Sequence, residues 1–297
     1  MNKIRDFFAK NEIKYSIDVS LKNISSFKIG GNADIICFPS NTEQVVKIIK
    51  YCIENNLEYL TFGRCSNVVF SDNGIRKLII KTDCLEELEQ DGDVFTLGAG
   101  VMLAKASKFT IDSGYKGMEF AYGIPGSVGG AVYMNAGAYG GEMSFYVIKT
   151  EYVNNKGEIC YITGDEHDFS PRHSFFSDKN YVITKTFVKL EKGNIEESYK
   201  LVDEFQTARK TKQPLEYPSA GSVFKRPTGY FAGKLIEDCN LKGATVGGAM
   251  VSQKHAGFII NYDNATAEDV KNLVLHIKEK VKTTFDVELE CEIKFFD

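Results

Sequence analysis

The chain has few of the residues that build metal centres and disulfide frameworks. Its four histidines are scattered, and no two of them have the spacing of metal ligands. The seven cysteines are odd in number and widely spaced, and the sequence contains no Cys-x-x-Cys. A disulfide framework and a zinc site are therefore disfavoured. We predict reduced, mostly buried thiols and no metal site.

The sequence also lacks long apolar runs and an excess of basic residues. No apolar run approaches the roughly 18–20 residues of a membrane helix, and the first ten residues carry charges too early and too often for a secretory signal. The net charge of −4 argues against general nucleic-acid binding but leaves room for a local cationic pocket. We therefore expect a cytoplasmic protein without a membrane or nucleic-acid partner, and the oligomeric state stays open.

Glycine, by contrast, is concentrated in one short window. The residues between these glycines are small and apolar, which is not the composition of a flexible linker. Dense glycine lets the backbone approach a ligand closely and lets consecutive amides point at it. We predict a glycine-lined wall against a flat or phosphorylated ligand. The window contains Gly117, Gly123, Gly126, Gly129, Gly130, Gly137, Gly140 and Gly141.

Hydrophobic periodicity predicts helices mixed with strands. Helices are expected over 102–111 and 196–212, after a capping box at Ser40–Glu43, and after a second cap at Thr266–Asp269. Because helices and strands do not alternate regularly, we predict an α+β fold. The most probable domain boundary is the linker at 191–196. Strands are expected at 33–38, 60–62, 68–70, 78–81, 94–97, 147–153, 181–190 and, with clean alternation, 287–295.

The standard nucleotide and hydrolase motifs fail. Gly98-Ala99-Gly100 lacks the third glycine of a dinucleotide fingerprint. The run from Gly229 to Lys234 is one residue too short for a P-loop, and the residues around Ser222 lack the glycines of a nucleophile elbow.

Four segments, taken together and in order, resemble the UDP-N-acetylenolpyruvoylglucosamine reductase family, flavoenzymes of peptidoglycan precursor synthesis. The likeness runs from about residue 20 to the C-terminus. The segments are Ser26–Asp34, the glycine window, Pro218–Pro227 and Val251–Asn261.

The resemblance implies a fold and a domain order. An N-terminal segment at 1–25 would precede a two-part FAD-binding module of the vanillyl-alcohol-oxidase/PCMH type at 26–192. An α+β substrate-binding domain would follow at 193–297. The short length suggests the form of the family that lacks an extra substrate-covering insertion.

The resemblance also implies a reaction. NADPH would reduce non-covalently bound FAD, and hydride would pass from flavin N5 to the vinyl carbon of UDP-N-acetylglucosamine enolpyruvate. The product is UDP-N-acetylmuramate. The negative charge left beside the carboxylate must be stabilised and then protonated. By its place in Pro171-Arg172-His173-Ser174, Arg172 would stabilise the enolate, and Ser222 in Gly221-Ser222-Val223-Phe224-Lys225 would donate the proton. Glu292, the second glutamate of Leu289-Glu290-Cys291-Glu292-Ile293, would act as an acid or orienting partner.

Binding residues follow from the same motifs. Two positions differ from the usual family residue: Cys65 stands where glycine is common, and Pro171 where tyrosine is common. The residues expected to bind FAD are Gly63, Arg64, Cys65, Ser66, Asn67, Gly123, Ile124, Pro125, Gly126, Ser127 and Gly130. The cations expected to meet the UDP phosphates are Lys212, Lys225, Arg226 and Lys254.

Two other functions stay open. One is a different flavin oxidoreductase built on the same FAD module. The other is a non-catalytic nucleotide-sugar sensor, which the joint presence of Arg172, Ser222 and Glu292 disfavours because a sensor needs no proton chemistry.

Overall fold

A computed structural model describes residues 2–297 and divides the chain into two compact units. Among the described residues, unit 1 comprises 2–17, 34–64 and 77–207, and unit 2 comprises 18–33, 65–76 and 208–297. The last crossing between them falls inside helix α5 (Ile195–Lys212). Each unit has its own hydrophobic core. The predicted domain limits are contiguous segments of the chain, and they stay a prediction.

A small parallel sheet in unit 1 is built around strand β5 (Leu78–Lys81). Strands β2 (Asn32–Phe38) and β3 (Tyr59–Phe62) pair with β5 in parallel on either side, and β1 (Lys14–Ser20) is the outer neighbour of β2. Helix α2 (Thr42–Glu54) connects β2 to β3 and buries its apolar face. The predicted strands at 33–38, 60–62 and 78–81 are confirmed to within a residue.

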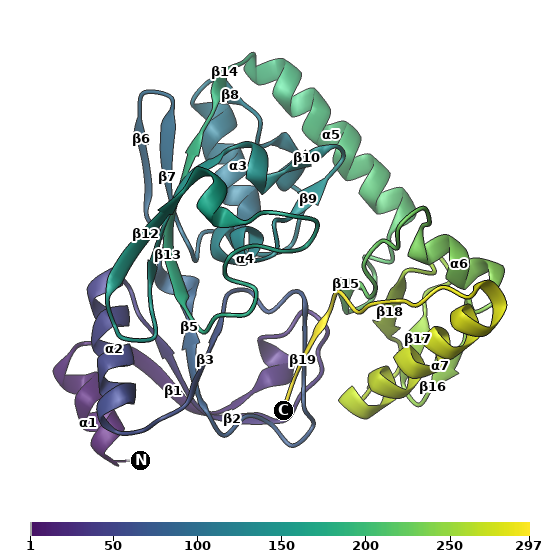
Figure 1. Cartoon of the computed structure of the whole chain (residues 1–297), viewed down its shortest axis with the longest axis horizontal. Coiled ribbons are helices and arrows are strands. Elements are labelled where there is room, and N and C mark those ends of the chain that lie inside the picture. Colours follow the sequence, from purple (N-terminus) through teal and green to yellow (C-terminus); the bar gives the residue numbers. More distant parts are fainter. Residues whose placement is uncertain (1) are drawn as a thin grey trace. The chain divides into compact units, whose positions relative to one another are not determined.

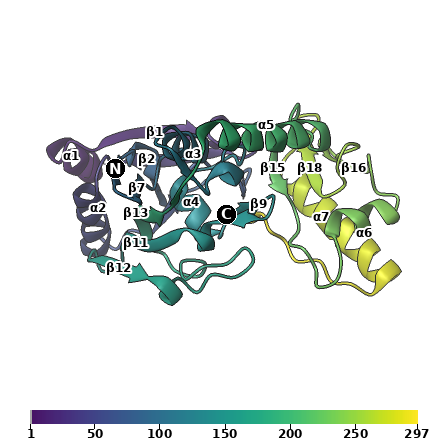
Figure 2. The same ribbon diagram turned by 90° about the horizontal axis from the view of Figure 1, so that it is seen from above.

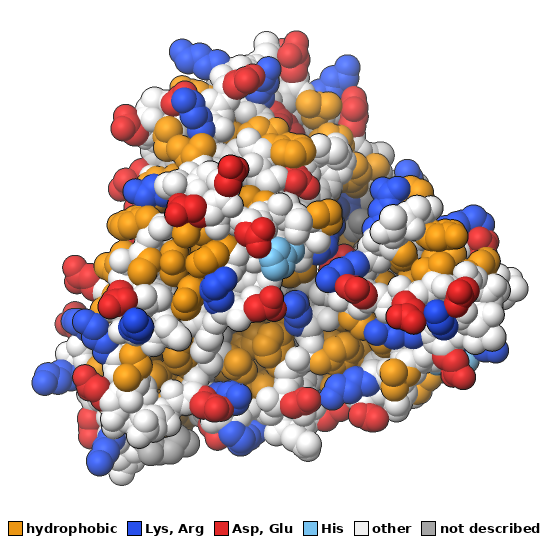
Figure 3. Space-filling model, in the orientation of Figure 1, with side chains coloured by type: hydrophobic (Ala, Val, Ile, Leu, Met, Phe, Trp, Pro, Cys, Tyr) orange, Lys and Arg blue, Asp and Glu red, His pale blue; other side chains and the backbone are white. Residues whose placement is uncertain are grey.

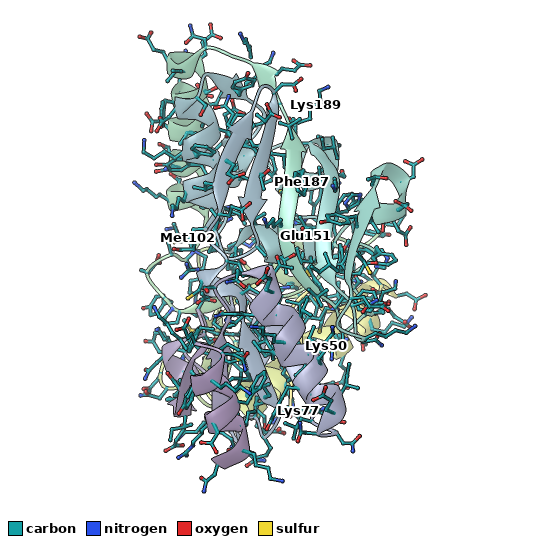
Figure 4. All side chains as sticks on the ribbon, turned by 90° about the vertical axis from the view of Figure 1, so that its left-hand side faces the viewer. Lys50, Lys77, Met102, Glu151, Phe187 and Lys189 are labelled. Atoms are coloured by element: carbon teal, nitrogen blue, oxygen red, sulfur yellow. The ribbon has the colours of Figure 1, made fainter. Side chains whose placement is uncertain are left out.

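Unit 1 also holds a five-stranded antiparallel sheet in the order β12-β11-β13-β7-β6. Figure 1 shows β6 and β7 as a hairpin at its edge, and Figure 4 labels Glu151 on β11 and Phe187 on the neighbouring β13. The strands are β6 (Leu88–Asp91), β7 (Val94–Gly98), β11 (Val147–Val153), β12 (Ile159–Thr163) and β13 (Val182–Lys189).

Shorter elements complete unit 1. Its helices are α1 (Asn2–Lys10), α3 (Leu103–Asp112) and α4 (Val128–Tyr133), with single 3-10 turns η2 (Thr82–Cys84), η3 (Glu119–Ala121), η4 (Met143–Phe145) and η5 (Gly164–His167). Two short strand pairs are β8 (Tyr115–Lys116) with β14 (Glu191–Lys192), and β9 (Gly137–Ala138) with β10 (Gly141–Glu142).

Unit 2 combines an antiparallel sheet with two helices. Its strands run in the order β15-β18-β17-β16, and helices α6 (Ala232–Asp238) and α7 (Ala267–Phe285) lie side by side (Figures 1 and 2). The sheet strands are β15 (Ser219–Ser222), β16 (Thr245–Val246), β17 (Ala249–Val251) and β18 (Phe258–Asn261). A separate parallel pair joins β4 (Val68–Phe70) to β19 (Lys294–Phe296), and η1 spans Leu21–Asn23. The α+β class is confirmed.

The helix caps agree with the sequence at one end of the chain and differ at the other. Thr266 caps α7, and its hydroxyl accepts from the amide of Asp269, as predicted. The capping box predicted at Ser40–Glu43 is wrong. Asn41 caps α2 instead, by accepting from the Gln44 amide at 2.9 Å, while the Gln44 side chain accepts from the Ser40 amide. An Asn cap with Gln44 at its third helical position competes in the same stretch and prevails.

The long final strand predicted over 287–295 is also wrong. Leu289 and Ile293 are buried, as the alternation predicts, but only Lys294–Phe296 pairs as a strand. The segment before it makes one isolated bridge, Phe224 to Cys291. Alternating hydrophobicity reports an extended backbone with one buried face, and it does not report whether a partner strand lies beside it.

Charges of both signs are interspersed with apolar side chains on the face of the molecule drawn in Figure 3. Among residues 2–297, no helix has the combination of length and apolar character that crossing a bilayer requires.

Candidate functional site

The predicted cofactor residues Gly63 and Arg64 follow directly on strand β3 in unit 1. Parallel sheets bind ligands beyond the carboxyl ends of their strands. Phe62 and Lys81, the last residues of β3 and β5, are register partners, so both strands end side by side at this point. The loop that follows β3 therefore begins where this fold class places a ligand.

A buried lysine lies beneath that loop. Lys81 is 2% exposed, and its ammonium donates to the Gly63 carbonyl oxygen and lies 3.2 Å from Asp83 Oδ1. Burying an ammonium is costly unless it is paired and hydrogen-bonded. Lys81 is not among the residues predicted from the sequence. The available signal was a lysine that closes the otherwise apolar strand Leu78–Lys81.

The surroundings of Gly63 and Ser127 fit a ligand that carries phosphate. Ser127 is 1% exposed, and its hydroxyl has no hydrogen-bond partner within residues 2–297. A Cβ placed on Gly63 would lie 2.3 Å from Ser127 Oγ. A buried hydroxyl without a partner, beside a residue that has no side chain to cover it, is suited to binding an anionic oxygen. The neighbouring residues predicted to bind cofactor, Gly123, Ile124, Pro125, Gly126 and Gly130, lie in and around the same loop before α4.

Arg172 lies at a strained position in a tight turn of unit 1. The turn runs from Ser170 to His173, and the His173 amide donates to the Ser170 carbonyl at 3.0 Å. Proline fixes φ at the second position, where Pro171 stands, and Arg172 at the third position has a φ of +60°. That combination defines a type II turn, whose third position normally takes glycine. An arginine held there costs stability.

The Arg172 turn is fastened to the glycine window. The Asn135 side chain, which is 1% exposed, donates to the Ser170 carbonyl at 3.3 Å and accepts from the Ser144 amide at 3.0 Å. The Ser174 hydroxyl donates to the Tyr133 carbonyl at 2.8 Å, and Arg172 Nη2 lies 3.4 Å from the Gly137 carbonyl oxygen. The predicted wall of glycines and the predicted enolate stabiliser are thus parts of one local structure.

Ser222 and Glu292 are adjacent within unit 2. Ser222 ends β15, and the Glu292 amide donates to the carbonyl of the next residue, Val223, at 2.8 Å. The Asn67 side chain donates to the Glu292 carbonyl at 3.1 Å. Glu292 is half-buried, whereas the charged side chains on either side of it in the same stretch, Glu288, Glu290 and Lys294, are exposed.

Three of the segments that carry the family resemblance meet in unit 2. The Ser26 hydroxyl donates to the Ser219 carbonyl at 2.8 Å, and the Ser26 amide donates to the Cys65 carbonyl at 3.2 Å. The Asn261 side chain donates to the Phe27 carbonyl at 3.1 Å. Cys65 is buried with a φ of +52°, a conformation that suits glycine, and Ser66 follows it.

The predicted phosphate cations contact several different partners. Lys225 lies 3.1 Å from Glu290, and the Arg226 guanidinium stacks over the Phe231 ring at 4.0 Å. Lys254 donates to the Lys210 carbonyl at 2.8 Å, in the last turn of α5, which also carries the exposed Lys212. Lys212 and Lys254 are thus associated with the same end of α5.

His255, beside Lys254, is neutral at pH 7. Burial lowers its pKa, and its Nδ1 accepts from the Gly257 amide at 3.0 Å. Burial also raises the pKa of the Cys291 thiol, so that the residue before Glu292 is not a thiolate. Within residues 2–297, no group of three or more His, Cys, Asp and Glu side chains could hold a metal ion.

The site residues are therefore divided between the units. Arg172, Gly63, Arg64 and the glycine window belong to unit 1. Ser222, Glu292, the remaining loop residues Cys65, Ser66 and Asn67, and the four cations belong to unit 2.

Residues 33–163 match the family described as FAD binding domain, and residues 213–296 match the C-terminal domain of UDP-N-acetylenolpyruvoylglucosamine reductase. Together with its relatives, these domains define the chain as an FAD-binding oxidoreductase. Because proteins that carry the name of this reductase are 42% and 44% identical over nearly the whole chain, the chain belongs to the UDP-N-acetylenolpyruvoylglucosamine reductase family.

Three relatives illustrate the likeness. The reductase of Clostridium perfringens is 42% identical over 299 residues, covering 99% of this chain and 98% of that protein. The reductase of Enterococcus faecalis is 44% identical over 284 residues, covering 96% and 95%. The crystal structure of the Thermus caldophilus reductase has a TM-score of 0.80 at 30% identity and covers 96% of this chain and 99% of that one.

Proposed function

We propose that this chain catalyses the NADPH-dependent reduction of UDP-N-acetylglucosamine enolpyruvate to UDP-N-acetylmuramate. Family membership supports the proposal at the level of the reaction, because relatives that match over nearly their whole length carry the name of this reductase. One observation supports roles for particular residues: the Glu292 amide donates a hydrogen bond to the Val223 carbonyl. This bond holds Glu292 beside the end of the strand in which Ser222 lies.

The charge that develops on the substrate sets what the protein must supply. FAD, when bound, supplies hydride chemistry by accepting a hydride from NADPH and delivering it to the vinyl carbon. The adjacent substrate carbon then carries negative charge shared with its carboxylate. We assign Arg172 to this charge, because a fixed guanidinium grips a carboxylate with two parallel hydrogen bonds. Removing one such preorganised donor typically costs about 3–4 kcal/mol of transition-state stabilisation.

Ser222 is assigned as the proton donor. A hydroxyl is a weak acid, so it serves only a strongly basic carbon held within hydrogen-bond reach. Its availability supports the assignment, since no described residue among 2–297 forms a hydrogen bond with the Ser222 hydroxyl. Glu292 is assigned as the neighbouring acid or as the group that orients the proton transfer.

The binding roles are proposed for the remaining residues. The loop 63–67 and residues 123–130 would bind FAD, with the Ser127 hydroxyl and the backbone at Gly63 facing its phosphates. Lys212, Lys225, Arg226 and Lys254 would meet the UDP diphosphate. The shared helix end of Lys212 and Lys254 favours these two as neighbours on one phosphate group.

The proposal is tested by NADPH oxidation with and without UDP-N-acetylglucosamine enolpyruvate. We expect yellow protein and oxidation that depends on the substrate, with UDP-N-acetylmuramate as the product. Yellow protein that oxidises NADPH without regard to this substrate would favour a different flavin oxidoreductase. Colourless protein that binds the nucleotide sugar and cannot be reconstituted with FAD would favour a sensor.

A further inference from the structure

Neutralising the charge of Asp83 does not by itself explain why Lys81 is buried. Its side chain is 3% exposed, whereas that of its partner Asp83 is 25% exposed. A second cation, the Arg64 guanidinium, already lies 3.9 Å from Asp83. Asp83 thus has a second cation beside it, and the Lys81 ammonium also donates a hydrogen bond to the Gly63 carbonyl.

That bond fixes the direction of one peptide group. The peptide between Gly63 and Arg64 is trans, because residues 2–297 contain no cis peptide bond. In a trans peptide the carbonyl and the following N–H point in opposite directions. With the Gly63 carbonyl held toward Lys81, the Arg64 amide must point away from it. Within residues 2–297 that amide has no hydrogen-bond partner.

A second donor without a partner lies beside the same glycine. The Ser127 hydroxyl is buried and unpaired among residues 2–297, and it occupies the space that a Cβ on Gly63 would need. Two unused donors, one from backbone and one from a side chain, thus accompany the turn that Lys81 holds in place. Concave groups of such donors bind anionic oxygens.

We propose that Lys81 is a positioning residue for the FAD pyrophosphate: by holding the Gly63 carbonyl it turns the Arg64 amide to the phosphate that also meets the Ser127 hydroxyl. The inference rests on the FAD-binding domain and on the proposed assignment of loop 63–67 to the pyrophosphate. It does not depend on the identity of the reduced substrate.

The test is the dissociation constant of FAD, measured by flavin fluorescence on FAD-free protein. Lys81→Met keeps the length and apolar stem of the side chain and removes its donors. We expect this variant to bind FAD about 10- to 100-fold more weakly, the usual effect of losing a hydrogen bond that involves a charged group. Lys81→Arg keeps charge and donors and is expected to recover at least half of the lost affinity on a logarithmic scale.

Lys77→Met is the matched control. Lys77 immediately precedes the same strand, at its opposite end, and forms an ion pair with Glu58 at 2.9 Å (Figure 4 labels it). We expect its FAD affinity to stay within about twofold of the parent protein, as surface ion pairs contribute little.

A double variant at Lys81 and Ser127 distinguishes a positioning role of Lys81 from a general contribution to the stability of the fold. If both residues serve one phosphate, the loss in Lys81→Met/Ser127→Ala should differ from the product of the two single losses by at least about threefold. An unchanged FAD affinity in Lys81→Met would overturn the inference. So would strictly multiplicative losses, an Arg variant as weak as the Met variant, or FAD-free Met protein that fails to fold, because a positioning role leaves the fold intact. The expected pattern of FAD affinities, together with a parent protein that shows no turnover of UDP-N-acetylglucosamine enolpyruvate, would instead count against the proposed function alone.

Discussion

At the scale of single residues, Arg172 combines a backbone that favours glycine with a side chain that the proposed chemistry needs. Its φ of +60° belongs to the left-handed region, where a side chain costs about 1 kcal/mol. The turn nevertheless holds an arginine beside the glycine window, with its guanidinium 3.4 Å from the Gly137 carbonyl. A purely structural turn at this place would be expected to use glycine.

Two substitutions at Arg172 separate the backbone from the side chain. Arg172→Gly and Arg172→Ala both remove the guanidinium, and both should slow substrate-dependent flavin reoxidation by about 10²–10³-fold. Only glycine relieves the strain, so Arg172→Gly should exceed Arg172→Ala in free energy of unfolding by about 1 kcal/mol. Urea denaturation of the two FAD-saturated variants measures the difference. An alanine variant as stable as the glycine variant would show that the turn is not strained.

Some residues of the candidate site could be predicted from local sequence motifs, and others could not. The motif positions of Ser222 and Arg172 were accessible because each lies in a short, distinctive stretch. Lys81 was not, because its significance lies in the Gly63 carbonyl 18 residues earlier, which only the pairing of β3 with β5 brings near it. The register of parallel strands joined by a helix cannot be read from local periodicity.

At the scale of elements, the antiparallel sheet of unit 1 is fastened by one buried carboxylate. Glu151 on β11 is 7% exposed and accepts hydrogen bonds from the hydroxyls of Thr42, Thr184 and Tyr161 at 2.8, 2.8 and 2.9 Å. Burial alone would raise the pKa of Glu151, but these three bonds and the nearby Lys185 lower it further than burial raises it, so its pKa falls below the ordinary value. Three elements, α2, β12 and β13, thus depend on one ionised group.

The pH dependence of Glu151→Gln follows from that direction. A carboxyl whose pKa is lower in the folded state stabilises the fold above its unfolded pKa of about 4.3 and loses that contribution as pH falls through the folded pKa. We expect the variant to lose about 1–3 kcal/mol of unfolding free energy at pH 7. The difference from the parent protein should shrink below about pH 4. Urea unfolding at several pH values checks this, with the exposed Glu89→Gln as control, and a gap that widens in acid would contradict it.

The predictions of helices and strands are confirmed where the residues of the segment itself determine its structure. The strands at 68–70 and 78–81 and the cap at Thr266 are local features, and all three are confirmed. The last strand failed because residues 287–293 alternate correctly yet lack a pairing partner over most of their length. Whether a partner strand lies beside an extended segment depends on residues that are distant in the sequence.

At the scale of the whole molecule, the two compact units are not two consecutive stretches of the sequence. Residues 18–33 and 65–76 belong to the same compact unit as residues 208–297, although long stretches of unit 1 separate them in sequence. The contacts of Ser26, Asn67 and Asn261 with distant segments account for this grouping. The α+β class could be predicted from the irregular succession of helices and strands, and the family from ordered motifs, whereas this interleaving depends on pairings that no single segment encodes.

The central claim is the role proposed for Ser222. We propose that Ser222 takes part in the reduction of the substrate and not in the reduction of the flavin. Rapid-mixing measurements on Ser222→Ala test it, with Ser219→Ala, in the same strand, as the matched control. We expect flavin reduction by NADPH within about twofold of the parent rate in both variants. Flavin reoxidation by UDP-N-acetylglucosamine enolpyruvate should slow by about 10²–10⁴-fold in Ser222→Ala only. Equal slowing of the two half-reactions, or reoxidation at the parent rate, would contradict the account.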